Sequence, residues 1–297
     1  MKDFCLGFSE YLVHQKSVSA NTLESYVRDV RHFILYLTKM GTENPALADT
    51  KIIQFYMADL KQNKKSSATI TRNVSSIRCF YQYLVYIGLT DTNPAKAIHL
   101  EKAEKKFPQI LSGKEIELLL SQPDIREPKG CRDKAMLELL YATGIRASEL
   151  VELNIDSINL SAGMLRCNSG RNERVIPVYP TAISAVANYI VKVRSKIITQ
   201  AGGKALFVNM NGGRLTRQGF WKIVKGYAEQ AKIVKEITPH TLRHSFALHL
   251  LENGAELKDI QAMLGHADIS STQVYVHLLN DHYKEVYNQC HPRAKLG

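Results

Sequence analysis

Apolar residues recur at helical spacing through most of this chain, and that periodicity constrains its fold more than any other feature. In the first half the pattern runs from Phe4 to about Gly88, as at Val30, Phe33 and Leu37, while strand-like alternation is scarce. This half therefore predicts a helical bundle.

One region of the second half departs from the helical pattern. Two strand-like segments, INLSAGMLRCN and ERVIPVYP, flank the turn residues SGRN and predict a β-hairpin. From Thr181 the pattern is helical again, apart from a possible short strand over Lys204 to Val208. The expected fold class is mainly α, with a small antiparallel sheet in the second half.

A charged segment separates the two halves. The stretch TDTNPAKAIHLEKAEKKFPQ has a proline near each end and a charged run from Glu101 to Lys106 between them, which is typical of a linker. We therefore expect a helical domain over residues 1–88, a linker over 89–108 and a second domain over 109–297.

The charge balance indicates the kind of partner. The 297 residues include 39 Lys and Arg against 28 Asp and Glu, a net charge of +11, which favours an extended anionic partner. Nucleic acid is the first expectation and an anionic membrane surface the second. The five cysteines are odd in number and form no C-x-x-C pair, which argues against a disulfide framework and a zinc ribbon. With no export leader and no membrane span in the sequence, we expect a cytoplasmic protein.

An arginine begins a helix in the stretch ATGIRASEL. Gly144 is expected to end the preceding helix, and Arg146 then opens the next one. A cation at a helix start opposes the helix dipole. Its position therefore indicates a use for Arg146 beyond local structure.

The stretch TPHTLRHSFALHLLENG predicts a second polar group on a helix. Thr238 is a good N-cap, so His240 and Arg243 fall one turn apart on the same face. His240 and His244 also have the spacing of a helical zinc site. Because Arg243 would repel a cation and the cysteines supply no further ligand, we predict no metal here.

The stretch LGHADISSTQVYVH adds a histidine and a tyrosine. His266 follows a predicted helix end, and Tyr275 lies in a helix expected to begin at Ser270. A lone tyrosine at helical spacing is ordinarily a packing residue. Taken together, however, two arginines, two histidines and a tyrosine are suited to binding a phosphate, moving a proton and forming a covalent ester.

The motifs ATGIRASEL, HTLRHSFA and LGHADISSTQVYVH closely resemble those of the tyrosine recombinases, also called the phage integrase family, and within it the bacterial Xer group. The first half resembles that family's helical, SAM-like core-binding domain. The resemblance covers nearly the whole chain, and it implies a two-domain, C-shaped clamp around DNA.

The resemblance also implies a role for each residue of the set. Tyr275 would attack a DNA phosphate and form a 3′-phosphotyrosyl bond, while Arg146 and Arg243 hold the phosphate oxygens. His240 would assist proton transfer, and His266 would bind or polarise the phosphate. The set requires no cofactor.

Four further arginines are expected to contact DNA. Arg72 and Arg78 lie among hydroxyl residues on one predicted helix, which suits a phosphate backbone, although a solvated helix face explains them as well. Arg171 and Arg174 lie in the predicted hairpin.

The expected substrate is double-stranded DNA with paired half-sites, bound by a homo-tetramer or by a hetero-tetramer with a related recombinase. Because the chain starts almost at the core-binding domain, an Xer-like role in resolving chromosome or plasmid dimers is favoured. An integrase of a mobile element, a type IB topoisomerase and a catalytically impaired DNA-binding protein are the alternatives.

One position departs from the family pattern. The hairpin of the family usually carries G-K-G-x-x-E-R, and alignment on Glu173 and Arg174 places Ser169 where the general-acid lysine is expected. Arg171 is nearby, but its pKa of about 12 or above makes it a poor acid. Natural variation, engineered inactivation and a shifted hairpin register remain open explanations.

Overall fold

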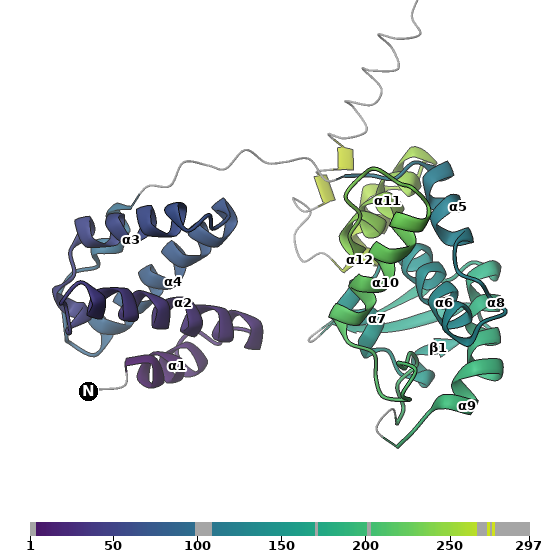
Figure 1. Ribbon diagram of the computed structural model, residues 1–297, viewed down its shortest axis with the longest axis horizontal. Helices are drawn as coiled ribbons and strands as arrows, with labels where there is room; N and C mark the ends of the chain where they lie inside the picture. The colour runs from purple at the N-terminus through teal and green to yellow at the C-terminus, as the bar shows by residue number, and fades with distance from the viewer. Residues whose placement is uncertain are drawn as a thin grey trace, which may run out of the picture. The chain divides into compact units, whose positions relative to one another are not determined.

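The computed structural model describes residues 4–98, 109–169, 172–200, 203–265, 272–273 and 275–276. Two compact units divide the chain, Met1–Lys105 and Lys106–Gly297. Helices dominate both, and the second unit also holds a three-stranded antiparallel sheet (Figure 1). The expected mainly α fold with a small sheet is confirmed. No described helix combines the length and the apolar character that crossing a membrane requires.

The first unit is a bundle of four helices joined by short turns. Side-chain caps start the three longer ones: Ser19, Asp49 and Ser66 each accept a hydrogen bond from the backbone N–H three residues later. The elements are α1 Phe4–His14, α2 Ala20–Lys39, η1 Pro45–Leu47, α3 Thr50–Gln62, α4 Ser67–Tyr86 and η2 Pro94–Ala97.

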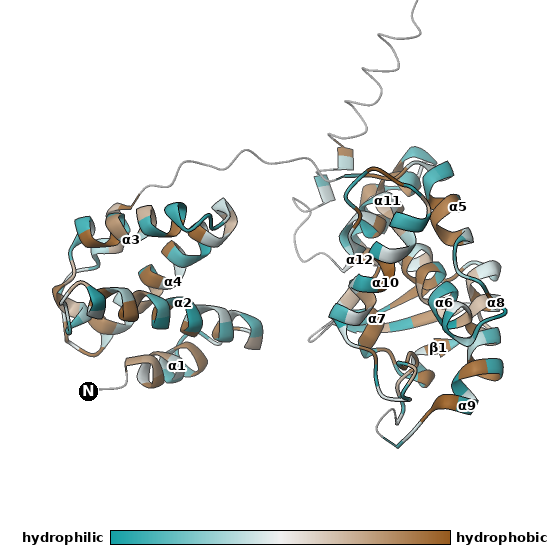
Figure 2. Ribbon diagram, in the orientation of Figure 1, coloured by the Kyte–Doolittle hydropathy of each residue, from teal (hydrophilic) through white to brown (hydrophobic). Residues whose placement is uncertain are grey.

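Aromatic side chains fill the core of the first unit. Phe8, Phe33 and Phe80 are completely buried, and α2, which carries Phe33, has both hydrophobic and hydrophilic residues along its length (Figure 2). Ala95 and Ile98, from the first part of the expected linker, are buried in the same cluster. The chain therefore packs against this unit as far as Ile98, and residues 99–108 lie outside the described residues.

The second unit places helices on a central α6 and on the sheet. Its elements are α5 Gly113–Ser121, α6 Pro128–Thr143, α7 Ala147–Glu152, η3 Ile155–Ser157, β1 Ile158–Asn159, β2 Met164–Ser169, β3 Asn172–Pro177, α8 Pro180–Tyr189, η4 Ile190–Arg194, α9 Ser195–Ile197, α10 Arg217–Gln230, α11 Pro239–Glu252 and α12 Leu257–Leu264. Helix α6 contacts α8, α11 and β3, while α7 contacts β2 and α10.

The strands run in the order β1-β2-β3, and both pairings are antiparallel. In the β2–β3 register Cys167 lies opposite Arg174, and Ser169 lies opposite Asn172. The hairpin expected from the sequence is therefore present. The short strand expected over residues 204–208 is wrong: Ala205 and Val208 form only isolated bridges, with Asn154 and Arg214 respectively.

Two helices of the second unit, α6 and α12, end at glycines. Gly144 follows α6 with φ +59°, and Gly265 follows α12 with φ +63°. Left-handed backbone is readily adopted only by glycine. Space is short as well, since a Cβ on Gly144 would lie 2.3 Å from Phe246 Cδ1 and 2.9 Å from Leu264 Cδ2.

Replacing Gly144 with alanine is expected to lower the free energy of unfolding by about 2–5 kcal/mol, because left-handed strain adds to overpacking against α11. Urea denaturation measures the loss. Gly254→Ala is the matched control, because Gly254 has φ +89° and open space around it. An equal loss in both variants would contradict the role of packing at Gly144.

Candidate active site

The first turn of α7 places Arg146 against Glu149. The Arg146 backbone N–H donates to Glu149 Oε2 at 2.7 Å, and Arg146 Nη1 donates to Oε1 at 3.1 Å. A carboxylate in this position caps the helix and offsets the unfavourable placement of the arginine. The Arg146 side chain is thereby oriented while 35% of it stays exposed.

Arg174 reaches the same carboxylate from β3. Its Nη1 and Nη2 donate to Glu149 Oε1 and Oε2 at 3.1 and 2.8 Å, and its Nε donates to the Met263 carbonyl at 2.8 Å. A Cβ on Gly265 would lie 2.9 Å from Arg174 Nη1, so a larger residue there would also displace the Arg174 side chain. Arg174 therefore connects the hairpin to α7 and to the end of α12.

Glu149 is a buried carboxylate between two guanidinium groups. Burial alone would favour its neutral form, but hydrogen bonds from Arg174 and from the Arg146 backbone, together with both positive charges, outweigh burial and lower the pKa of Glu149. Glu149 is therefore ionised at neutral pH. We assign it a positioning role for Arg146.

Arg243 is held by backbone carbonyls. It projects from α11 and is only 3% exposed; its Nη1 donates to the Gly144 carbonyl at 2.6 Å and its Nη2 to the Leu264 carbonyl at 2.7 Å. Burial, followed by the nearby charge of Arg146, lowers the pKa of Arg243 to about 10. The group therefore remains cationic at neutral pH, with a fixed orientation.

His240 lies one turn before Arg243, at the exposed start of α11. Partial desolvation of its ring, followed by the positive charges of Arg243, Arg146 and Arg217, lowers the pKa of His240. The imidazole is therefore neutral at pH 7. Arg146 and Arg243, which were predicted from separate motifs, therefore both lie near His240.

Tyr275 packs into a small core formed by α11 and α12, and it is 1% exposed. Its hydroxyl lies 2.8 Å from His244 Nδ1. Burial raises the pKa of Tyr275, and the charge of Arg243 partly opposes that rise. The structure thus brings Tyr275 within electrostatic range of Arg243. The helix start expected at Ser270 lies outside the described residues.

Three other predicted site positions are described incompletely or not at all. His266 and Arg171 lie outside the described residues. For Ser169 the structure gives the strand register but not the side chain. Within the described ranges, no group of three or more His, Cys, Asp or Glu is arranged to hold a metal ion.

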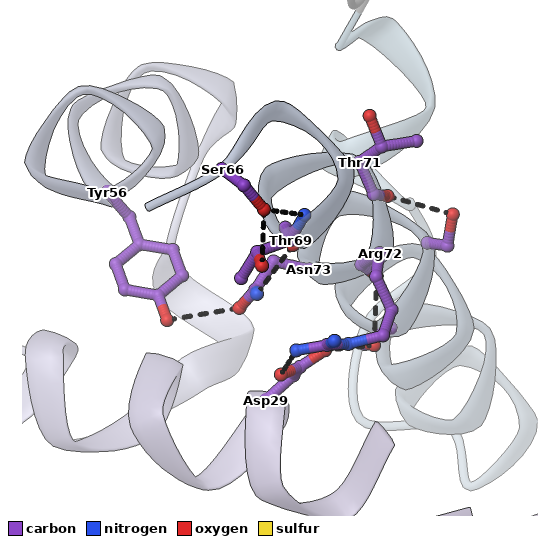
Figure 3. Close-up of polar contacts among 9 residues, drawn as sticks. Asp29, Tyr56, Ser66, Thr69, Thr71, Arg72 and Asn73 are labelled. Carbon is purple, nitrogen blue, oxygen red and sulfur yellow. Dashed lines mark hydrogen bonds and ion pairs between the residues drawn. The ribbon is translucent and has the colours of Figure 1, made fainter. Parts of the chain in front are cut away.

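In the first unit, Arg72 is bound to a buried carboxylate (Figure 3). Its Nε and Nη2 donate to Asp29 Oδ2 and Oδ1 at 2.8 and 2.9 Å, and Ser76 Oγ also donates to Asp29 at 3.0 Å. Asp29 is 2% exposed, whereas the Arg72 side chain is 37% exposed. This pair connects α2 to α4 and leaves part of the guanidinium at the surface.

Arg78 also has partners within the chain. Its Nε donates to the Ala95 carbonyl at 3.0 Å, and its Nη2 donates to the Ile98 carbonyl. It therefore fixes η2 and the residue after it against α4. Contact of Arg72, Arg78, Arg171 and Arg174 with DNA stays a prediction.

No role in the site was predicted for Glu149 or His244. Glu149 follows Arg146 by three residues, which is the spacing of a capping glutamate, so the sequence does indicate its contact with Arg146. His244 was considered only as a possible zinc ligand, and its contact with Tyr275 joins residues 31 positions apart. Sequence spacing does not reveal such a contact.

Two family profiles match the chain. The profile described as "Phage integrase family" matches residues 109–282, and the one described as "Phage integrase, N-terminal SAM-like domain" matches residues 6–87. The two matches fall on the second and first compact units respectively.

Curated relatives match along nearly their full length. The chain is 42% identical to tyrosine recombinase XerD of Listeria monocytogenes serotype 4b over 297 residues, which covers 99% of this chain and 100% of the relative. It is 46% identical to tyrosine recombinase XerD of Oceanobacillus iheyensis over 293 residues, which covers 97% of each.

Solved structures share the fold. The XerH site-specific recombinase bound to a palindromic difH substrate, a post-cleavage complex, has a TM-score of 0.73 at 18% identity and covers 96% of this chain and 95% of its own. The integrase of transposon Tn1549 in complex with a circular intermediate DNA has a TM-score of 0.73 at 18% identity, covering 92% and 94%.

Replacing Glu149 with glutamine is expected to destabilise the fold by roughly 3 kcal/mol at neutral pH, because Arg174 then lacks its buried charge partner. The folded pKa of Glu149 is depressed, so its contribution is present above the unfolded value and is lost as the pH falls through the folded one. The difference in unfolding free energy between wild type and variant should therefore shrink in acid.

Urea denaturation over a pH series measures that difference. Glu152→Gln is the control, because Glu152 lies exposed on the same helix and should change stability by less than about 0.5 kcal/mol. A Glu149→Gln penalty that stays constant into acid would contradict the assignment of the stabilising charge.

Proposed function

Because the chain belongs to the phage integrase family and is a tyrosine site-specific recombinase, we propose that Tyr275 cleaves DNA at a phosphate held by Arg146 and Arg243. One observation carries the proposal: Arg243 donates to the Gly144 carbonyl, two residues before Arg146, and to the carbonyl of Leu264, whose side chain packs in the same small core as Tyr275. The three predicted groups therefore come from segments that meet at Arg243.

In the proposed reaction the Tyr275 hydroxyl oxygen attacks phosphorus. The Oη–P bond forms as the bond to the 5′-oxygen breaks, which leaves a 3′-phosphotyrosyl ester and a free 5′-hydroxyl. Two guanidinium groups neutralise the non-bridging oxygens as negative charge develops on them. The ester conserves the energy of the broken bond, so the 5′-hydroxyl of another strand can reseal the DNA without ATP.

The two predicted histidines complete the proposed site. His240 is neutral at pH 7, so we assign it a hydrogen-bonding role in proton transfer next to Arg243. His266 follows Gly265 directly, and we propose that it binds the same phosphate. Domains of residues 1–88 and 109–297 would both bind duplex DNA, and the net charge of +11 makes that binding strongly salt-dependent.

We propose an Xer-like role, the resolution of chromosome or plasmid dimers in the cytoplasm. The curated XerD relatives, matched over nearly their whole length, support this role over that of a mobile-element integrase. Paired half-sites imply four subunits on two duplexes, either four copies of this chain or two each of this chain and a related recombinase. Site choice then depends on contacts with base edges.

Tyr275→Phe is expected to abolish covalent attachment to DNA and to leave DNA affinity nearly unchanged, because only the hydroxyl is lost. The target is first identified by sequencing the DNA recovered with the protein. A nicked suicide substrate carrying that site then traps the adduct. Tyr141→Phe is the control, because Tyr141 makes the same kind of bond to a histidine of α11, at 2.8 Å from His249.

A plasmid with two target sites tests the reaction as a whole. Wild type should recombine the sites, whereas a type IB topoisomerase would only relax the plasmid, and an impaired DNA-binding protein would do neither. A covalent adduct formed by Tyr275→Phe would reject Tyr275 as the nucleophile.

The hairpin is proposed to limit the chemical step. The β2–β3 register, with Arg174 opposite Cys167 and bound to Glu149, supports aligning Ser169 with the family lysine. A serine is a weak proton donor, and a general acid contributes about 10²–10⁴-fold in rate. One changed contact among many phosphate contacts alters affinity little.

Ser169→Lys is therefore expected to accelerate cleavage of an ordinary phosphodiester by up to about 10²–10⁴-fold. It should give little gain on a substrate with a 5′-bridging sulfur, whose thiolate leaves without a proton. Asn168→Lys is the control, because adjacent strand residues face opposite sides of the sheet. Equal acceleration on both substrates would show that position 169 does not supply the acid.

A further inference from the structure

The nucleophile proposed above has a histidine as its hydrogen-bond partner. Tyr275 Oη lies 2.8 Å from His244 Nδ1, and the two rings are 5.7 Å apart at 53°. His244 follows Arg243 directly on α11 and lies one turn after His240, with 6.4 Å between the two imidazoles. It therefore shares a helix face with His240 and is adjacent to Arg243 in sequence.

The burial of Tyr275 bears on the direction of this bond. Tyr275 is 1% exposed, and a buried hydroxyl proton requires an acceptor. Among the described residues, His244 Nδ1 is the acceptor within hydrogen-bond distance of this hydroxyl. The tautomer with its proton on Nε2 leaves Nδ1 free to accept. In that tautomer Tyr275 donates and His244 accepts.

The attacking oxygen needs such an acceptor. Burial raises the pKa of Tyr275, so the phenol carries its proton at neutral pH. The charge of Arg243 favours the phenolate but only partly offsets burial. A nucleophile in this state is activated by an adjacent base within hydrogen-bond reach.

A second tyrosine–histidine pair, whose histidine also lies on α11, differs from the first in its surrounding charges. Tyr141 Oη lies 2.8 Å from His249 Nδ1, the same distance. Burial raises the pKa of Tyr141 too, but there Glu117 and Glu252 raise it further. Negative charges disfavour the Tyr141 phenolate, whereas the Arg243 guanidinium favours the Tyr275 phenolate. The two pairs therefore share their geometry and differ in the sign of the charges around them.

We propose that His244 is a catalytic residue that accepts the phenolic proton of Tyr275 as the tyrosine attacks DNA. This inference rests on the proposed function of Tyr275. As the Oη–P bond forms, the proton moves from Oη to Nδ1, and the electron pair of the broken P–O bond leaves with the 5′-oxygen, which takes its proton from another donor. During resealing His244 returns its proton to Tyr275.

The test compares single-turnover cleavage of two nicked suicide substrates, one with an ordinary 5′-oxygen and one with a 5′-bridging sulfur at the scissile phosphate. In His244→Asn, the Oδ1 atom replaces Nδ1 as a hydrogen-bond acceptor but cannot take up the proton. Cleavage should slow by about 10²–10⁴-fold on both substrates, because sulfur removes the need for an acid and not for a base. DNA affinity should be unchanged.

His249→Asn is the matched control and should cleave like wild type. If His244→Asn unfolds, as judged by thermal denaturation, His244→Gln takes its place. Unchanged or faster cleavage by the His244 variants would overturn the inference and indicate that the bond merely holds Tyr275. A defect that the sulfur substrate repairs would also overturn it, because His244 would then act on the leaving group.

The same experiment separates this inference from the function on which it rests. If wild type forms no adduct on either substrate, the proposed function fails and the role of His244 fails with it. If wild type forms an adduct, Tyr275→Phe forms none and His244→Asn cleaves normally, only the inference on His244 fails.

Discussion

The rest of the site depends on the ion pairs that the carboxylate of Glu149 forms with two arginines. This carboxylate is buried, and a buried carboxylate stays ionised only with charged partners. Its two partners come from different elements, Arg146 from the start of α7 and Arg174 from β3. The carboxylate therefore fixes a short helix against a hairpin, and the orientation of Arg146 follows from both. The Arg174 bond to the Met263 carbonyl extends this constraint to α12.

The contacts of Arg174 and those of Arg243 meet at the last turn of α12. The consecutive carbonyls of Met263 and Leu264 accept hydrogen bonds from Arg174 and Arg243 respectively. Gly265 then turns the chain in a left-handed conformation, with no room for a side chain beside Arg174. The hairpin, through Arg174, and α11, through Arg243, are therefore both bound to the end of α12, immediately before His266 in sequence.

Features set by local chemistry could be predicted from the sequence, and features set by distant contacts could not. Thr238 caps α11, and Gly144 ends α6, as expected from neighbouring residues alone. The wrong strand over residues 204–208 had suitable local composition, but Ala205 bridges only Asn154, some fifty positions away. The intramolecular partners of Arg72 and of Tyr275 likewise come from distant segments.

Binding Arg243 through carbonyls has a consequence for the charge of the site. The Gly144 and Leu264 carbonyls end two helices, so they orient the guanidinium and stabilise it as dipoles without neutralising it. Among the described residues, Glu149 is the one acid paired with the cluster of Arg146, Arg174 and Arg243, so these four groups together carry a surplus of two positive charges. A phosphodiester carries one negative charge, and its pentavalent transition state carries two. The two surplus charges of these residues therefore match the charge of the phosphate in the transition state better than its charge in the bound substrate.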